Sequence, residues 1–218
     1  MANFAVHVGG GIVAGLGCTA MSLLVFDFKN PWFAATAGVA AIVGSMLPDI
    51  DHDEAIPIRE VFGVLAAAVP AMAMPYLMRV YGLSTEQGIC FFSATYLAIR
   101  FVVAPIFKAF TVHRGIFHSL PFIVAAGQAL ALGLVGLNPM ERLLIGISLT
   151  FGALVHLILD EVYAVDFTGR RLKKSFGTAI KLWSSDLIPT MLCYGALLGL
   201  TAASVLRLGP LLQRLFFK

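Results

Sequence analysis

Long apolar stretches decide what this chain can fold into. Hydrophobic residues make up 59% of the 218 residues and charged residues only 12%, which is about half of the roughly 25% that is usual in soluble domains. A chain with so few charges cannot cover a water-facing surface, so the sequence predicts an integral membrane protein. We expect an all-α, polytopic fold that forms a single membrane-embedded domain over residues 1–218.

About seven segments are apolar enough to be transmembrane helices, each of which needs about 20 mostly apolar residues. Short loops separate most of them, and the second and sixth segments are the shortest. The long exception among the loops runs from Glu161 to Asp186. The predicted spans are residues 5–25, 32–48, 61–80, 88–107, 116–136, 143–160 and 187–206.

Threading this chain through a membrane collects its histidines at one face. We call the face that holds the N-terminus side A and the opposite face side B. Nine of the twelve acidic residues also fall on side A, as do eight Lys and Arg residues against six on side B, so we expect side A to face the cytoplasm. The predicted topology therefore indicates a site built from several helices. The histidines on side A are His7, His52, His113, His118 and His156.

The sequence "HLILDE" (156–161) contains a pair of metal-ligand type. His156 and Asp160 are four residues apart near the end of an apolar segment. On a helix this spacing puts them on one face, one turn apart, where an imidazole and a carboxylate can share one ion such as zinc. The alternative is a helix end whose polar residues simply meet water.

The sequence "HRGIFHS" (113–119) supplies two more histidines. His113 and His118 are five residues apart, a poor spacing for one helical face, but Gly115 indicates a turn between them that lets both point inward. Pro121 fits the first turn of the helix that follows. Arg114 lies between the histidines and can bind phosphate oxygens in a bidentate manner. The alternative is a basic loop anchored to lipid headgroups.

The sequence "PDIDHD" (48–53) concentrates ligand-type groups at the end of a span. Asp49, Asp51, His52 and Asp53 could divide between residues that bind an ion and residues that orient those ligands. A solvated loop that ends the span is the alternative. His7, within the first apolar segment, would lie level with these residues, although a lone histidine there is usually a packed residue with one hydrogen bond.

Arg100 lies within "TYLAIRFVVAPIF", about two turns from the side-A end of its predicted span. An arginine inside the membrane is energetically costly and is a candidate for a functional residue. We expect it to clamp a phosphate or carboxylate group. The alternative is that its side chain extends toward side A to reach water.

Residues 170–183, within the basic loop 161–186, show helical spacing of their apolar side chains. Leu172, Phe176 and Trp183 fall on one narrow stripe, while the basic residues lie off it. This pattern predicts an amphipathic helix lying on anionic headgroups, although Gly177 weakens it. An ordinary basic loop beside the membrane is the alternative.

Taken together, the chain resembles the YdjM family of LexA-regulated, inner-membrane metal-dependent hydrolases. The resemblance rests on an early histidine followed in order by "LPDIDH", "HRGIFHS" and "HLILDE", and it spans residues 7–161. That family is distantly similar to zinc-dependent phospholipase C and to fungal single-strand nucleases, helical enzymes that bind zinc through His and Asp. The resemblance implies that His156 and Asp160 match their His-x-x-x-Asp helix and that Asp49 matches an upstream ligand. Residues 170–183 lie outside this pattern.

The leading functional hypothesis is a membrane-bound hydrolase that cleaves a phosphoester in a lipid or lipid-linked substrate by metal-activated water. More than four candidate ligands suggest more than one divalent ion, with Zn²⁺ preferred and Mn²⁺ as an alternative. Asp51, Asp53 or Glu161 would act as the general base, and Arg100 and Arg114 would hold the phosphate. The predicted metal ligands are His7, Asp49, His52, His113, His118, His156 and Asp160.

Two other classes of protein fit the same sequence. One is a transporter of metal ions or one coupled to protons, although transporters usually place their polar sites near the bilayer midplane. The other is a non-catalytic membrane protein with a structural metal, whose coordination would be closed. Membrane lipids are the expected partners in every case, and neither nucleic acid nor an obligate protein partner is indicated.

Overall fold

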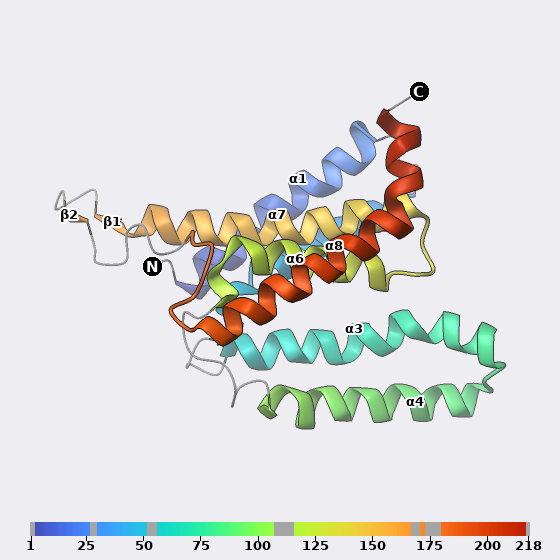
Figure 1. The fold of residues 1–218 in the computed structure, drawn as a ribbon. Coiled ribbons are helices and arrows are strands. Elements are labelled where there is room, and N and C mark those ends of the chain that lie inside the picture. Colours follow the sequence, from blue (N-terminus) through green and yellow to red (C-terminus); the bar gives the residue numbers. More distant parts are fainter. Residues whose placement is uncertain are drawn as a thin grey trace.

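A computed structural model describes residues 3–26, 30–51, 56–106, 116–166, 171–172 and 180–216 (Figure 1). The described chain is helical apart from one pair of two-residue antiparallel strands, β1 (Val165–Asp166) and β2 (Arg171–Leu172). Short helical turns, η1 (Pro48–Asp51), η2 (Ile99–Val103) and η3 (Ile116–His118), lie between or continue the main helices. The main helices are α1 (Phe4–Leu24), α2 (Pro31–Gly44), α3 (Ile56–Tyr81), α4 (Thr85–Ala98), α6 (Leu120–Gly133), α7 (Pro139–Tyr163) and α8 (Leu187–Phe216).

The all-α class predicted from the sequence is confirmed, and an apolar helix lies at each of the seven expected places. Five of the described helices are long and apolar enough to cross a membrane: α1, α7 and stretches of α3, α4–η2 and α8. The other two, α2 and α6, are apolar but contain only 14 residues each. By length, therefore, the described chain has five candidate spans rather than seven.

Helix α7 is longer than predicted, because it has 25 residues where a short sixth span was expected. Asn138 caps its N-terminus and forms a capping box with Glu141, since each side chain accepts a hydrogen bond from the other's backbone N–H. The helix therefore begins in the polar loop before the apolar segment. At its other end it continues past Asp160 to Tyr163.

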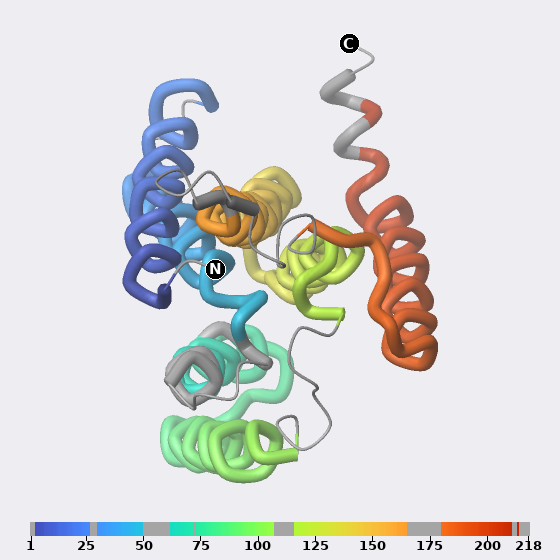
Figure 2. The backbone as a smooth tube through the Cα atoms, turned by 90° about the vertical axis from the view of Figure 1, so that its left-hand side faces the viewer, coloured from blue at the N-terminus to red at the C-terminus, as the bar shows by residue number. Residues whose placement is uncertain are grey.

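The helices run back and forth, and α7 packs against α1, α2 and α6 (Figure 1). Helix α8 packs mainly on α6, while α3 and α4 form a hairpin set apart from the other helices (Figure 2). Gly82, with φ of +61°, makes the turn of that hairpin, a conformation that costs glycine little. The hairpin meets the rest of the chain where Phe62 packs against Met46, Leu47 and Phe117.

Helices α2 and α7 approach each other unusually closely. A Cβ atom added at Gly152 would overlap the carbonyl oxygen of Ala41, and one added at Gly44 would overlap the carbonyl oxygen of Leu149. Side chains would hold these backbones apart, so both glycines are needed for the contact. This contact places the end of α2, and the η1 turn after it, directly beside the last turns of α7.

Arg142 joins the beginning of α7 to the end of α6. Its guanidinium donates hydrogen bonds from Nε to the carbonyl of Ala131 and from Nη2 to the carbonyl of Leu132, both at 2.8 Å. The last carbonyls of a helix have no partner within the helix, and a buried arginine needs acceptors. The arrangement satisfies both requirements.

The amphipathic helix predicted over residues 170–183 is not found at the residues the structure describes. Arg171 and Leu172 pair with β1 instead, and the segment from Ile180 is non-helical. The Leu120 N–H donates a hydrogen bond to the Lys181 carbonyl at 2.9 Å, which ties this segment to the start of α6. Residues 173–179 lie outside the described residues.

Candidate metal centre

Five buried histidine and aspartate side chains meet at the end of the bundle where α1 begins and α7 ends. They come from four separate elements, and the ends of these elements face the viewer in Figure 2. Each of the five residues is between 0% and 8% exposed. The five residues are His7 on α1, Asp49 in η1, His118 in η3, and His156 and Asp160 on α7.

The Nε2 atoms of the three imidazoles all face the two carboxylates. His7 Nε2 lies 3.3 Å from Asp160 Oδ1 and 4.0 Å from Asp49 Oδ2. The Nε2 atoms of His118 and His156 each lie 3.5 Å from Asp49 Oδ1. They lie 3.9 and 3.8 Å, respectively, from Asp160 Oδ2.

These separations fit ligands that surround a cation. A tetrahedral ion with bonds of about 2.0–2.1 Å holds neighbouring ligand atoms about 3.3–3.4 Å apart, close to the shorter distances here. Two buried carboxylates next to each other are also costly without compensating charge. Moreover, His156 Nε2 is buried without a hydrogen-bond partner among the described residues. The donor set therefore suits a divalent ion between Asp49, Asp160 and the imidazoles.

The orientation of His156 is fixed by a backbone carbonyl. Its Nδ1 lies 2.7 Å from the carbonyl oxygen of Ser45, so the Nδ1–H donates to that oxygen and the Nε2 lone pair faces the carboxylates. A second hydrogen bond of this kind is the usual way in which a protein sets the tautomer of a metal-binding histidine. The close contact of α2 with α7 brings Ser45 to this position.

The five side chains form one centre rather than two. They can be grouped as His7, Asp49 and His156, or as His118, His156 and Asp160, with the ligand atoms of each group within 4.8 Å of one another. Both groups need His156, which has a single nitrogen left after its bond to Ser45. The ring of His7 stacks on that of His156 with centroids 3.7 Å apart, which further links the groups. Within the described residues, the arrangement suits a single ion.

Asp49 lies in η1, outside the helices that are long enough to span a membrane. Burial alone would raise the pKa of its carboxyl group, but the imidazoles of His118 and His156 beside it hold that pKa well below its ordinary value. Asp49 is therefore ionised at neutral pH and available as an anionic ligand.

The structure brings together five of the seven predicted metal ligands. His52 and His113 lie outside the described residues, as do Asp53 and Arg114. Asp51 belongs to η1, but its side chain is not described. Glu161 follows Asp160 on α7 and is half-buried, and it belongs to neither ligand group.

Arg100 is also half-buried, and it lies in the π-helical turn η2 that continues α4. Such turns are rare and frequently accompany functional sites.

Ser45 also contributes to the metal centre, but the sequence did not predict this. It acts through its backbone carbonyl, which leaves no signature in the sequence.

The fold and this cluster define a helical protein of membrane type that carries a buried His/Asp centre suited to a metal ion. The profile of the YdjM inner membrane protein family matches residues 1–172, and the chain belongs to that family. The match includes all five cluster residues and ends before α8 begins. No curated protein and no solved structure shows significant similarity to the chain.

Proposed function

We propose that this protein is a multi-pass, metal-dependent membrane hydrolase that cleaves a phosphoester in a lipid or lipid-linked substrate. The observation that carries the proposal is the convergence of three imidazoles and two carboxylates, from four elements, at one end of the bundle. Such a donor set favours Zn²⁺, with Mn²⁺ as the alternative. In this proposal the short helices α2 and α6 also cross the membrane, which gives seven spans in all, and the metal centre lies on the cytoplasmic side.

Each residue of the centre has a distinct part in this proposal. His7, Asp49, His118, His156 and Asp160 would hold the ion, and the Ser45 carbonyl keeps His156 in the tautomer that can bind it. A bound divalent ion supplies Lewis acidity and lowers the pKa of a coordinated water to about 7. Glu161 is the described candidate for the general base, because it is half-buried and next to Asp160 on α7.

The depth of the centre in the bundle supports a lipid substrate. Tyr163, three residues beyond Asp160, is exposed, and so is Trp183 in the segment that is hydrogen-bonded to the start of α6. Exposed Tyr and Trp side chains are enriched at the level of lipid headgroups. A centre at this level would meet the phosphoester groups of lipids without removing them from the membrane.

Removal of the metal should abolish hydrolysis. We expect the purified protein, reconstituted in phospholipid vesicles, to release phosphate or a phosphorylated headgroup. A chelator should stop the release and added Zn²⁺ or Mn²⁺ should restore it, because the ion activates the water. Product release, followed by mass spectrometry over a panel of phosphoester, carboxylic ester and amide lipids, is the measurement. Turnover that survives complete chelation would contradict the proposal.

Arg100→Ala should lower phosphoester turnover while leaving the metal content intact. Arginine donates hydrogen bonds but cannot bind a cation. Loss of a donor aimed at the developing charge costs about 10²-fold in turnover. Arg79→Ala is the matched control, because Arg79 is an exposed arginine in the last turn of α3. Equal activity of the two variants would show that Arg100 only extends its side chain to water.

The burial of the centre supports a second candidate, a structural metal site in a non-catalytic membrane protein. All five residues are at most 8% exposed, as expected for a closed site whose coordination leaves no position for water. A metal-loaded protein that hydrolyses no phosphoester, ester or amide would favour this candidate over the hydrolase.

A further inference from the structure

A second feature lies between α6, α7 and α8, away from the His/Asp cluster. It is a cavity of about 520 Å³, within the range of roughly 300–1,000 Å³ that is usual for small-molecule sites. Small or buried residues form its floor, namely Gly127, Ala131, Gly146 and Leu208. The glycines bring the backbones of α6 and α7 so close that an added Cβ at either position would overlap the other helix.

The cavity opens sideways between the helices. The exposed side chains of Ile147, Phe151 and Val205 line it, and they lie on helices that are long and apolar enough to cross a membrane. In a protein of the inner membrane, the medium outside this opening is lipid hydrocarbon. A lipid chain is therefore the molecule that can enter.

The dimensions of the cavity match one chain of one leaflet. The lining residues of α7 run from Leu143 to Leu154, which spans about 16 Å at the helical rise of about 1.5 Å per residue. A single leaflet contributes about half of the roughly 30 Å hydrocarbon core. Most of these residues precede the midpoint of α7, although Leu154 lies beyond it. His156 and Asp160 lie toward the other end of the helix, so most of the cavity lies on the side of the bundle away from the metal centre.

Polar groups along α8 add a recognition element to this apolar space. Ser204 lines the cavity, and its buried Oγ has no hydrogen-bond partner among the described residues. A buried hydroxyl without a partner is unfavourable, and a ligand carbonyl would satisfy it. Thr201 lies about one turn before Ser204 on α8 and is hydrogen-bonded to Gln128 of α6. Gln128 Nε2 donates to Thr201 Oγ1 at 3.1 Å.

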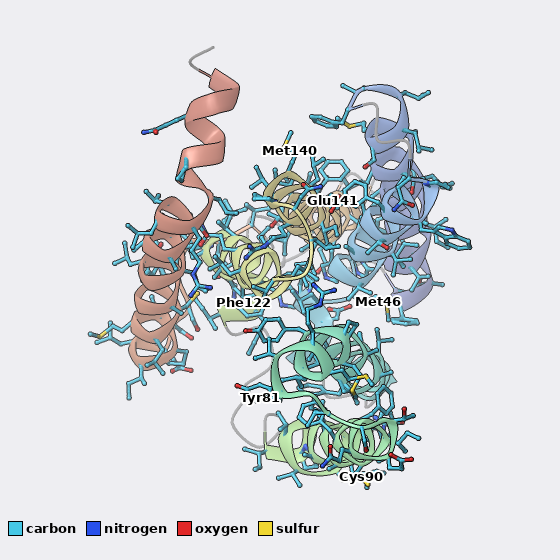
Figure 3. All side chains as sticks on the ribbon, turned by 90° about the vertical axis from the view of Figure 1, so that its right-hand side faces the viewer. Met46, Tyr81, Cys90, Phe122, Met140 and Glu141 are labelled. Carbon is cyan, nitrogen blue, oxygen red and sulfur yellow. The ribbon has the colours of Figure 1, made fainter. Side chains whose placement is uncertain are left out.

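Arg207 provides a positive charge at the side-B end of the cavity. It is exposed and lies three residues after Ser204, so the two side chains are neighbours on the helix surface. Arg142, in contrast, is committed to the last carbonyls of α6. This end of the bundle faces the viewer in Figure 3, with Met140 and Glu141 labelled at the start of α7. From this end inward, the order is therefore an exposed guanidinium, a hydroxyl with no hydrogen-bond partner among the described residues, and an apolar channel.

We propose that this cavity is a binding site for a phospholipid of the leaflet opposite the metal centre. One acyl chain fills the channel between α6, α7 and α8. The ester carbonyl of that chain accepts a hydrogen bond from Ser204 Oγ, and the phosphate pairs with Arg207. The site goes beyond the proposed hydrolysis, because it does not involve the His/Asp cluster. It also uses α8, which begins after the family match ends at residue 172.

Photo-crosslinking in vesicles tests this site directly. The full chain is reconstituted with a phospholipid that carries a photoreactive diazirine in one acyl chain, and labelled peptides are mapped by mass spectrometry. We expect labelling to concentrate on residues 143–154 and 201–208. Val205→Trp should lower it about tenfold or more, which corresponds to at least about 1.4 kcal/mol of binding, because the indole blocks the channel.

Matched variants separate the site from general lipid contact. Leu206→Trp is the control, since Leu206 is 79% exposed, against 59% for its neighbour Val205, and does not line the cavity. Arg207→Ala should reduce labelling by the phospholipid but not by a diacylglycerol that carries the same chain, because only the phospholipid has a phosphate. The His156→Ala/Asp160→Ala variant should be labelled like the unmodified protein.

Three results would overturn the proposal. Even labelling of all lipid-facing helices would mean that only surrounding bilayer lipid is detected. Equal labelling of the Val205→Trp and Leu206→Trp variants would show that the channel is not occupied. Crosslinks between two protein chains at residues 201–208 would show that a second copy covers the cavity instead.

Discussion

Replacement of both His156 and Asp160 by alanine should leave the purified protein without its divalent ion. These two residues supply one imidazole and one carboxylate from successive turns of α7, and their ligand atoms lie 3.8 Å apart. The double change removes two of the five groups that face the centre, including the one nitrogen shared by both ligand groupings. We expect metal analysis of protein in detergent to fall from about one ion per chain to background, because a zinc site normally needs four ligands.

A control from the same end of the protein makes this result specific. Asp186→Asn changes an exposed acidic residue just before α8 and should leave the metal content unchanged. The single variants His156→Ala and Asp160→Ala should each weaken metal binding, as measured by competition with a chelator of known affinity. Full occupancy in the double variant would exclude this pair as ligands.

Gly152→Ala should damage both the fold and the metal centre. The new methyl group would overlap the Ala41 carbonyl oxygen, which is backbone and cannot rotate away. Helix α2 would have to move off α7, and this shift would carry the Ser45 carbonyl away from His156 Nδ1. Overpacking that forces the backbone to shift typically costs about 1–3 kcal/mol and occasionally more. We expect a large loss of thermal stability together with weaker metal binding.

Gly9→Ala provides the matched comparison for this change. Gly9 lies on α1, and a Cβ added there meets nothing within 4 Å. The same chemical change should therefore be neutral, or stabilising by up to about 1 kcal/mol through helix propensity. Thermal unfolding in detergent and metal content would be measured on both variants. If Gly152→Ala behaved like Gly9→Ala, α2 and α7 would not be in the contact described.

The helices could be predicted from the sequence because apolar length is a local property. Helix ends were harder, since the capping box of Asn138 and Glu141 carries α7 beyond its apolar segment. The metal-ligand candidates could be predicted because the predicted seven-span topology places His7 at the same end as His156, and the structure brings these two side chains together. Their convergence thus followed from counting spans.

The features that shape the centre could not be found in this way. The contact between Gly152 and Ala41 depends on which two helices are neighbours, and the sequence does not state that pairing. The Ser45 carbonyl belongs to the backbone, so no residue type reveals it. The cavity beside Ser204 is likewise a property of three helices together, because none of its residues is unusual in its own segment.

The separation of the ligands along the chain also determines when the centre can exist. His7 lies on α1, whereas His156 and Asp160 lie on α7, which is synthesised later. Of the five residues in the cluster, a nascent chain that ends before α7 contains His7, Asp49 and His118 but not His156, the residue that the Ser45 carbonyl orients. An ion could therefore meet all five side chains only after α7 has been inserted. An ion bound there would connect α1 to α7, two helices that are far apart in the sequence.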